Sequence, residues 1–381
     1  MHIIEEQIEA KKHGRLHFSS SIARDVWHED ARNGAYQWWY FDATSDDGRD
    51  TLVIIFLDNF IFSPRYNRAI STRKLAHTEQ TLTHSSKMPV RFPAIAFCWY
   101  RNHRPLIRSI NEFTADEFAA RTDRPTCRIG QNSFYCDDST SNPSYNLELA
   151  TALRRGRRMK AKFTWEVIEG DFTTNGQEQS AVQFGHEWNL VAPRCRVTGA
   201  LRLIEPDGRR AEEHCFQGLG YHDHNRDSRP MPATIAEWQW GRAHFPHATA
   251  VFYRYRERGS EKYDTRLFIV RHKELVEHEA HCLTKAMRRH FFGLRYPRAL
   301  CFAAQDEDQK ATLSVKQSRI IDGSFFYLRF LGRATLDCGK GYVQQAVAVT
   351  EQLAPHILQK RALWWLINMR IGRRGRASFL P

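Results

Sequence analysis

The sequence gathers hydrogen-bonding side chains in one short run, GLGYHDHN at residues 218–225. If this run forms a β-strand, alternate side chains point to opposite faces. Tyr221, Asp223 and Asn225 then share one face. His222 and His224 share the other. The two glycines at the start of the run predict a place where the backbone bends or where a ligand approaches closely.

Three kinds of chemistry fit this run. His222 and His224, two residues apart on a strand, could bind zinc or iron. The third ligand would come from His186, Glu187 or His214. A second interpretation is structural, with the polar run making turn and inter-domain hydrogen bonds. We favour the third, acid–base catalysis in an apolar pocket, because burial raises a carboxyl pKa and would keep a proton on Asp223 near neutral pH. His222 or His224 would then tune or reload that acid.

Two aromatic runs show the same alternation. In YQWWYFD at residues 36–42, one face would carry Trp38, Tyr40 and Asp42. In EWQWGR at 237–242, Trp238 and Trp240 would share a face with Arg242. Such faces either pack as ordinary core or line a cavity in which π systems attract a developing cation. The residues predicted to contact a substrate are Trp38, Tyr40, Asp42, Asn225, Trp238, Trp240 and Arg242.

The elements that must position these residues look like strands. Short apolar runs are separated by Gly, Pro, Asn and Asp, and residues 196–205 and 265–272 approach strand-like alternation. Asp207-Gly208 is a good hairpin turn. Helical periodicity is sustained mainly at 351–372. The pattern therefore predicts an all-β chain of sandwich or barrel type.

Size and charge limit the possible functions. A chain of 381 residues and 44.6 kDa favours two domains. Lys plus Arg is 56 and Asp plus Glu is 43, which leaves a net charge of +13 and suits an anionic surface, either nucleic acid or lipid headgroups. No nucleic-acid reader motif accompanies that charge, so we expect no nucleic acid partner. Nucleophile-elbow, phosphate-loop, dinucleotide and HExxH motifs are also missing.

Compartment and membrane contact can be predicted from the same sequence. The eight cysteines form no CxxC pair, and although Cys127 and Cys136 could bridge a hairpin, reduced thiols are favoured. The N-terminus mixes acids and bases without an apolar stretch, so we expect a cytoplasmic protein. Residues 360–376, KRALWWLINMRIGRRGR, are basic and rich in Trp. They predict a peripheral contact with the inner face of the cytoplasmic membrane. The alternative is a terminal helix that packs Trp364 and Trp365 onto the barrel and leaves its arginines in solvent.

Taken together, several motifs resemble the carotenoid 1,2-hydratase (hydroxyneurosporene synthase) family, whose fold is lipocalin-like. The resemblance spans residues 34 to 372, nearly the whole chain. WWYFDA together with GYHDHN is its most specific part. The stretches that carry it are YQWWYFDATSDDG, FSPRYNRA, HEWNLVAP, GLGYHDHN, EWQWGRA and TEQLAPHILQKRALWWLINMRI.

The resemblance implies two lipocalin-like β-barrel or β-sandwich domains with a short C-terminal helix. We expect a lead-in at 1–34, β domains at 35–210 and 211–355, and the basic segment at 356–381. It also implies addition of water to the C1–C2 double bond of an acyclic carotenoid such as neurosporene or lycopene, with no metal or redox cofactor. Asp223 would be the acid, with Tyr221 beside it. Relatives commonly continue the motif with Trp-Gly, where this chain has Arg226-Asp227.

The expected mechanism is protonation of C2, which leaves a tertiary carbocation at C1 that water captures. His222, His224 or Asn225 would orient that water. Two other functions use the same apolar site. One is a non-catalytic carrier of an apolar lipid or pigment. The other is a cyclase or pericyclase acting on a polyene.

Overall fold

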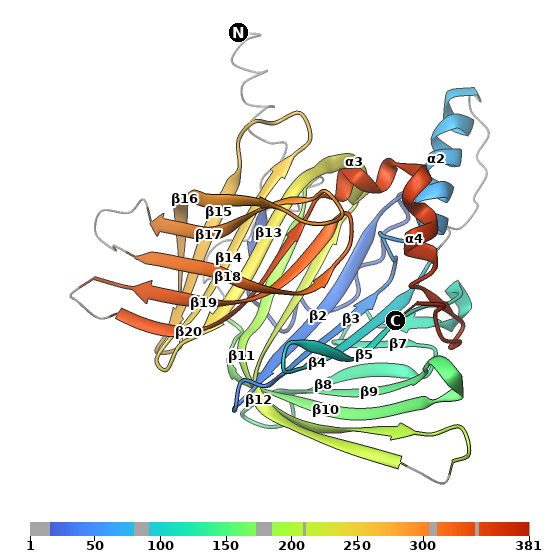
Figure 1. Cartoon of the computed structure of the whole chain (residues 1–381), viewed down its shortest axis with the longest axis horizontal. Helices are drawn as coiled ribbons and strands as arrows, with labels where there is room; N and C mark the ends of the chain where they lie inside the picture. Colours follow the sequence, from blue (N-terminus) through green and yellow to red (C-terminus); the bar gives the residue numbers. More distant parts are fainter. Residues whose placement is uncertain are drawn as a thin grey trace. The chain divides into compact units, whose positions relative to one another are not determined.

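The computed structural model describes residues 16–79, 91–172, 185–208, 211–304, 311–339 and 343–380. Within them the chain is mainly β-strand (Figure 1). It divides into two compact units. The first comprises Met1–Trp99, Leu106–Met231 and Leu358–Pro381, and the second comprises Tyr100–Pro105 and Pro232–Ile357. The predicted all-β, lipocalin-like fold is confirmed.

The first unit is built on one curled sheet. Its strand order is β21-β5-β4-β3-β2-β12-β11-β10-β9-β8-β7-β6, and β1 pairs with β11. The strands are β1 His17–Ser19, β2 Tyr36–Ser45, β3 Asp50–Leu57, β4 Ala94–Arg101, β5 Arg104–Glu112, β6 Phe118–Ala120, β7 Thr126–Ile129, β8 Asn132–Asp137, β9 Ser144–Ala152, β10 Arg158–Glu169, β11 Glu187–Ile204, β12 Ala211–Asp227 and β21 Gly372–Arg373.

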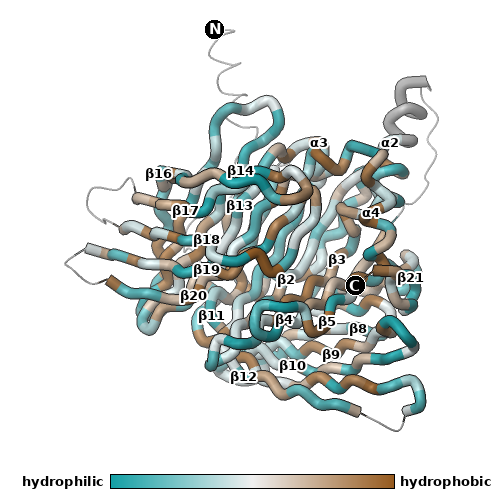
Figure 2. Tube along the Cα trace, viewed as in Figure 1, coloured by the Kyte–Doolittle hydropathy of each residue, from teal (hydrophilic) through white to brown (hydrophobic). Residues whose placement is uncertain are grey.

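Burial along the strands shows where the core of this unit lies. On β10, buried Met159, Ala161 and Phe163 alternate with exposed residues, so one face of that strand packs inward. Hydropathy alternates along many of the strands (Figure 2). On β2, by contrast, Tyr36–Ala43 is buried on both faces. Trp39 and Phe41 point into the core cluster, which leaves the opposite face of β2 for other contacts.

The second unit is a closed barrel of eight antiparallel strands. They are β13 Ile235–His244, β14 Thr249–Glu257, β15 Asp264–Arg271, β16 Glu274–Arg289, β17 Arg295–Ala304, β18 Thr312–Gly323, β19 Tyr327–Asp337 and β20 Val343–Leu353. Its core includes Phe252 and Phe302, whose rings stack with centroids 4.4 Å apart. Leu267, Leu313 and Leu336 belong to the same core.

The hairpin between β11 and β12 shows where the first compact unit ends along the chain. Ile204 pairs with Ala211, and Gly208 adopts φ 69°, which confirms the predicted turn at Asp207-Gly208. The expected boundary between 210 and 211 would cut this hairpin in two. The compact units divide after Met231 instead, because β12 hydrogen-bonds to β11 on one side and to β2 on the other.

Helices are few and short. They are α2 Pro64–Glu79, α3 Met231–Thr234 and α4 Trp364–Asn368, with 3₁₀ turns at Ala115–Glu117, Arg154–Gly156, Pro355–Gln359 and Arg361–Leu363. The helical pattern read at 351–372 corresponds to the end of β20, two 3₁₀ turns and α4. Sequence analysis missed α2, although Ser63-Pro64 is a typical helix start. The Ser63 hydroxyl accepts the Arg65 backbone N–H at 3.2 Å.

The C-terminal segment is anchored on the first unit. β21 pairs in parallel with β5. Trp364 is buried, and its Nε1–H donates to the Leu358 carbonyl at 2.7 Å. Trp365 is 58% exposed. Trp364 is therefore buried, as the alternative predicts, although its segment belongs to the first unit, and Trp365 is exposed.

All eight cysteines are free thiols, so the bridge considered between Cys127 and Cys136 is not formed. Among the residues that the structure describes, none of the helices has the length and apolar composition that crossing a membrane requires.

Candidate active site

The two faces of β12 separate the polar run as the alternation predicts. In the antiparallel ladder with β2, Asp223 lies opposite Tyr40 and Asn225 lies opposite Trp38. Directly opposed residues share a face of the sheet. On the other side of β12, Trp188 of β11 lies opposite Asn225. The structure thus brings Tyr221, Asp223 and Asn225 together with Trp38, Tyr40 and Asp42 on one face of the sheet.

The Asp223 carboxyl is fixed by three donors. Tyr221 donates its hydroxyl to Oδ2 at 2.6 Å, and Trp188 Nε1–H donates to the same oxygen at 2.8 Å. Asn225 Nδ2–H donates to Oδ1 at 2.9 Å. The residue is only 3% exposed. Donors held in place on both oxygens orient the carboxyl and stabilise negative charge wherever it develops on it.

A buried histidine, His186, holds the Asn225 side chain in place. His186 Nε2 lies 3.2 Å from Asn225 Oδ1, and its Nδ1 lies 3.3 Å from the Tyr36 hydroxyl. Burial lowers the pKa of His186 from 6.5 to about 3, so its ring is neutral. A neutral ring donates from one nitrogen only. Donation from Nε2–H to Asn225 leaves Nδ1 to accept from Tyr36, and this fixes the Asn225 amide that holds Asp223.

Aromatic rings surround this face of the sheet. Trp38 stacks on Tyr36 with ring centroids 5.3 Å apart and planes 9° apart. Tyr40 meets Tyr221 edge to face at 6.2 Å. The Tyr40 hydroxyl donates to Asp42 Oδ2 at 3.3 Å. The Asp223 carboxyl therefore lies on a sheet face that carries several aromatic rings and fixed hydrogen-bond donors.

His222 and His224 point the other way, toward Asp25. His222 Nε2 lies 2.9 Å from Asp25 Oδ2, and His224 Nδ1 lies 3.2 Å from Oδ1. The predicted separation of these histidines from Asp223 is therefore found, because successive residues of a strand face opposite ways. Their role in tuning or reloading that acid stays a prediction. Sequence analysis missed Asp25, which lies in the expected lead-in and carries no local signal of a role.

Asp25 is a buried ionised carboxylate. Burial alone would raise its pKa, but the His222 charge and the hydrogen bonds of both histidines outweigh it and lower the pKa to about 2. His222 Nδ1 lies 3.0 Å from the Tyr40 carbonyl. With an acceptor at each ring nitrogen, His222 carries hydrogen on both. A buried ion pair therefore lies directly behind the strand segment that presents Asp223.

Aromatic side chains enclose that ion pair. Phe41 stacks on His222 at 3.9 Å, and Trp39 stacks on His224 at 4.7 Å. Tyr145 donates its hydroxyl to Asp25 Oδ2 at 2.7 Å. Because the rings and the carboxylate hold both histidines, this side of β12 has little freedom to move.

The metal interpretation finds little support in these positions. His186, one of the suggested third ligands, lies on the Asp223 side, and Glu187 pairs with Arg226 at 2.5 Å. His214 lies 3.1 Å from Glu212. Within the described part of the chain no group of three His, Cys, Asp or Glu is arranged to hold a metal ion.

The two glycines at the start of the run allow neighbouring strands to approach β12 closely. A Cβ on Gly220 would lie 2.6 Å from Trp165 Nε1 and 2.8 Å from the Asp42 carbonyl oxygen. A Cβ on Gly218 would lie 2.1 Å from the Thr44 carbonyl oxygen. We expected either a bend in the backbone or the close approach of a ligand at these glycines. The structure instead shows neighbouring strands of the sheet in close approach.

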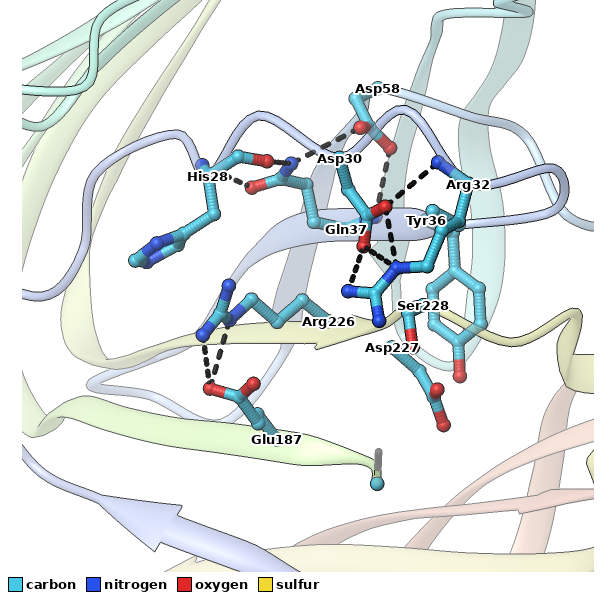
Figure 3. A pocket seen from close by; sticks show the side chains of 12 residues that line it. His28, Asp30, Arg32, Tyr36, Gln37, Asp58, Glu187, Arg226, Asp227 and Ser228 are labelled. Carbon is cyan, nitrogen blue, oxygen red and sulfur yellow. Dashed lines mark hydrogen bonds and ion pairs between the residues drawn. The ribbon is translucent and has the colours of Figure 1, made fainter. Parts of the chain in front are cut away.

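A small polar pocket of about 30 Å³ lies at the end of β12 (Figure 3). Tyr36, whose hydroxyl contacts His186, is among its lining residues. Arg226 and Glu187 form an ion pair across it (Figure 3). Asp227 pairs with Arg229 at 2.9 Å. Arg226 and Asp227, which replace the usual Trp-Gly of the motif, therefore each form an ion pair.

Trp238, Trp240 and Arg242 lie on β13, in the second unit. They alternate with Gly241 and Ala243, and Ala243 belongs to the barrel core, so the three share the opposite face of that strand. Trp238 contacts the Tyr253 ring at 5.2 Å. Their role in binding a substrate stays a prediction.

Comparison with known proteins decides the family. The model of the carotenoid hydratase CrtC family matches residues 151–380, more than half of the chain. This protein belongs to the CrtC carotenoid hydratase family. The match includes β11 and β12, and with them Asp223 and its donors Tyr221, Trp188 and Asn225. CrtC membership makes the protein a hydro-lyase, an enzyme that adds water to a double bond, and gives an apolar carotenoid as its class of substrate.

Individual proteins resemble the chain in sequence or in fold. The hydroxyneurosporene dehydrogenase of Chlorobaculum tepidum is 25% identical over 371 residues, covering 95% of this chain and 94% of that protein. The acyclic carotenoid 1,2-hydratase of Thiocapsa roseopersicina is 27% identical over 220 residues, 58% of this chain but only 47% of that protein. Among solved structures, CghA with Sch210972 has a similar fold, with a TM-score of 0.58 at 11% identity over 90% of this chain and 97% of that one.

Proposed function

We propose that the protein adds water across the terminal C1–C2 double bond of an acyclic carotenoid of the neurosporene or lycopene type. The observation that carries this proposal is the Asp223 carboxyl, held by three donors on a buried aromatic face. Family membership and the name of the Thiocapsa roseopersicina relative support the same reaction.

The first step is transfer of a proton from the Asp223 carboxyl to C2. The electron pair of the double bond forms the new C–H bond, and C1 becomes a tertiary carbocation. Negative charge appears on the carboxyl at that moment, where Tyr221, Trp188 and Asn225 already point their hydrogens. The π faces of Trp38 and Tyr40 would stabilise the cation by about 1–2 kcal/mol each in a dry site.

The second step is capture of the cation by water. The water oxygen bonds to C1, and its proton returns to the Asp223 carboxylate, which restores the acid. The carotenoid and one water are the only reactants, and the reaction needs no oxidant or reductant. The Tyr221 hydroxyl, which donates to Oδ2 at 2.6 Å, keeps the carboxyl in place through both steps.

The test is product analysis with the purified protein and detergent-dispersed lycopene. The wild type is expected to give a product heavier by one water. Asp223→Asn keeps the size and part of the hydrogen bonding of the side chain but has no acidic proton, so hydration should fall by at least 10²-fold. Asp138→Asn, an exposed acid on the first unit, is the matched control and should keep full activity.

Other products would contradict the proposal in distinguishable ways. Pigment returned unchanged by the wild type indicates a carrier. An isomer of unchanged mass indicates a cyclase. A product lighter by two hydrogens indicates the dehydrogenation that the name of the Chlorobaculum tepidum relative describes. Near-normal hydration by Asp223→Asn would remove Asp223 from the acid role.

We also propose that segment 360–376 reaches a lipid surface on the inner face of the cytoplasmic membrane. Trp365 is its exposed aromatic residue, and the segment carries six Lys and Arg residues without an acid. Weaker binding of Trp365→Ser to anionic vesicles is the expected result. Unchanged binding would exclude this contact.

A further inference from the structure

The β16–β17 hairpin of the second unit exposes two phenylalanines at its tip. Arg289 pairs with Arg295 at the end of the two strands. The turn is closed by hydrogen bonds from His290 N–H to the Leu294 carbonyl at 2.7 Å and from Gly293 N–H to the His290 carbonyl at 2.8 Å. The tip is therefore an ordered turn. It presents Phe291, 92% exposed, and Phe292, 40% exposed, with ring centroids 5.4 Å apart.

The apolar surface continues down β16 (Figure 1 shows the strand). Met287 and Leu283 are exposed on it. Single exposed apolar residues are common, but a run of large ones around an ordered tip marks an interaction surface. Nothing among the described residues covers Phe291, so its ring gains most by entering an apolar phase.

The flanks of the same hairpin are strongly basic. Residues 280–304 contain no Asp or Glu. None of their basic side chains forms an ion pair with another described residue. These basic side chains are Lys285, Arg288, Arg289, Arg295 and Arg298. Cations left without carboxylate partners around an apolar tip are complementary to an anionic surface.

A hollow of about 510 Å³ lies beside the hairpin. Arg288, Arg298 and Arg319 line it, and Ser318 adds a hydroxyl. Tyr296 and Phe330, with ring centroids 5.2 Å apart, form its aromatic side. Guanidinium groups are suited to grip a phosphate through paired hydrogen bonds. The three arginines can bind the phosphate of a phospholipid, and the neighbouring aromatic rings can contact its acyl chain.

We propose that this hairpin docks on an anionic phospholipid surface. Phe291 and Phe292 enter the boundary between headgroups and acyl chains, the basic flanks lie on the headgroups, and the arginine-lined hollow seats a lipid phosphate. A second copy of this chain fits less well, because two such hairpins would bring like charges together. Nucleic acid would use the arginines but has no place for the exposed Phe291 ring.

The surface is argued from its own residues and does not depend on the proposed reaction. The reaction supplies a reason for it, since an acyclic carotenoid dissolves in lipid. The lipid-docking proposal and the hydration proposal can be disproved independently of each other. A variant that loses lipid binding should still hydrate detergent-dispersed lycopene at the normal rate, because the hairpin belongs to the second compact unit and Asp223 to the first.

The experiment is flotation of the full-length protein with phosphatidylglycerol vesicles and with phosphatidylcholine vesicles. The wild type should bind phosphatidylglycerol. Phe291→Ser with Phe292→Ser should weaken that binding by at least roughly tenfold. Arg288→Gln with Arg298→Gln should weaken it by roughly fivefold for each arginine. The matched control is Arg271→Gln with Lys273→Gln, which neutralises two cations at the other end of β16 and should bind within twofold of wild type.

Three results would overturn the proposal: equal binding to both lipids, undiminished binding of the phenylalanine variant, or the same loss in the control as in the arginine variant. Salt-sensitive binding of duplex DNA that the phenylalanine variant retains, with no vesicle binding, would assign the surface to nucleic acid instead. Thermal unfolding of each variant checks that these exposed changes leave the fold intact.

Discussion

At the scale of single residues, the chemistry of the site depends on how one carboxyl is surrounded. Tyr221, Trp188 and Asn225 leave Asp223 one orientation, and His186 fixes Asn225 in turn. The opposite side of the same strand segment is held by a second carboxylate, Asp25. The two acids have different surroundings, which suits different tasks: Asp25 is a paired anion that holds the strand, and Asp223 faces aromatic rings.

The Asp25–His222 pair can be tested through stability. Asp25→Asn keeps the shape but leaves a buried His222 without its counter-charge, so the free energy of unfolding should fall by about 3–5 kcal/mol. Adding His222→Gln removes the uncompensated charge, and the double variant should lose less than the sum of the two single variants. Urea unfolding of the three variants measures this. Strictly additive losses would contradict the buried pair.

His186 predicts a particular pH dependence of stability. Its pKa falls from 6.5 in the unfolded chain to about 3 in the folded protein, so between these values the unfolded chain binds more protons. Stability should therefore fall as pH falls from about 6.5 toward 3, by up to about 1.4 kcal/mol per pH unit for this one group. His186→Gln should flatten the curve over that window. An unchanged slope in the variant would show that His186 is already charged in the folded state.

At the scale of elements, strand alternation explains why the faces of β2 and β12 could be predicted. Once GYHDHN and YQWWYFD are strands, the period of two places Asp223 apart from His222. The register between strands is not contained in any local pattern. For that reason Trp188, on β11, and Asp25, in the loop before β2, could not be predicted as the partners of this run. α2 was missed because its sequence has few apolar residues at helical spacing.

Gly220 tests the close approach of strands at the site. A Cβ there would meet Val197 Cγ2 at 2.4 Å as well as the Trp165 ring and the Asp42 carbonyl. Gly220→Ala should cost about 1–3 kcal/mol of stability, because a backbone oxygen cannot move aside easily. Gly259→Ala is the control, since its Cβ meets nothing within 4 Å and only its φ of +82° is unfavourable. Equal losses in the two variants would mean that crowding at Gly220 is relieved without cost.

At the scale of the whole molecule, the fold class followed from the sequence but the division of the chain did not. The first unit is made of three separate stretches of sequence, because β21 and α4 return to it after the barrel is complete. No local pattern near residue 210 reveals that β12 belongs to the same sheet as β11 and β2. Tyr221, Trp188 and Asn225, which donate to the Asp223 carboxyl, lie in the first unit.

The most direct test of the proposed chemistry is where hydrogen from the solvent ends up in the product. Lycopene incubated with the wild-type protein in deuterium oxide should give a hydrated product with one deuterium bonded to carbon at C2 and the oxygen at C1. Nuclear magnetic resonance of the purified product locates both atoms. Oxygen at C1 without deuterium at C2 would contradict proton transfer from an acid that exchanges with water, and with it the role given to Asp223.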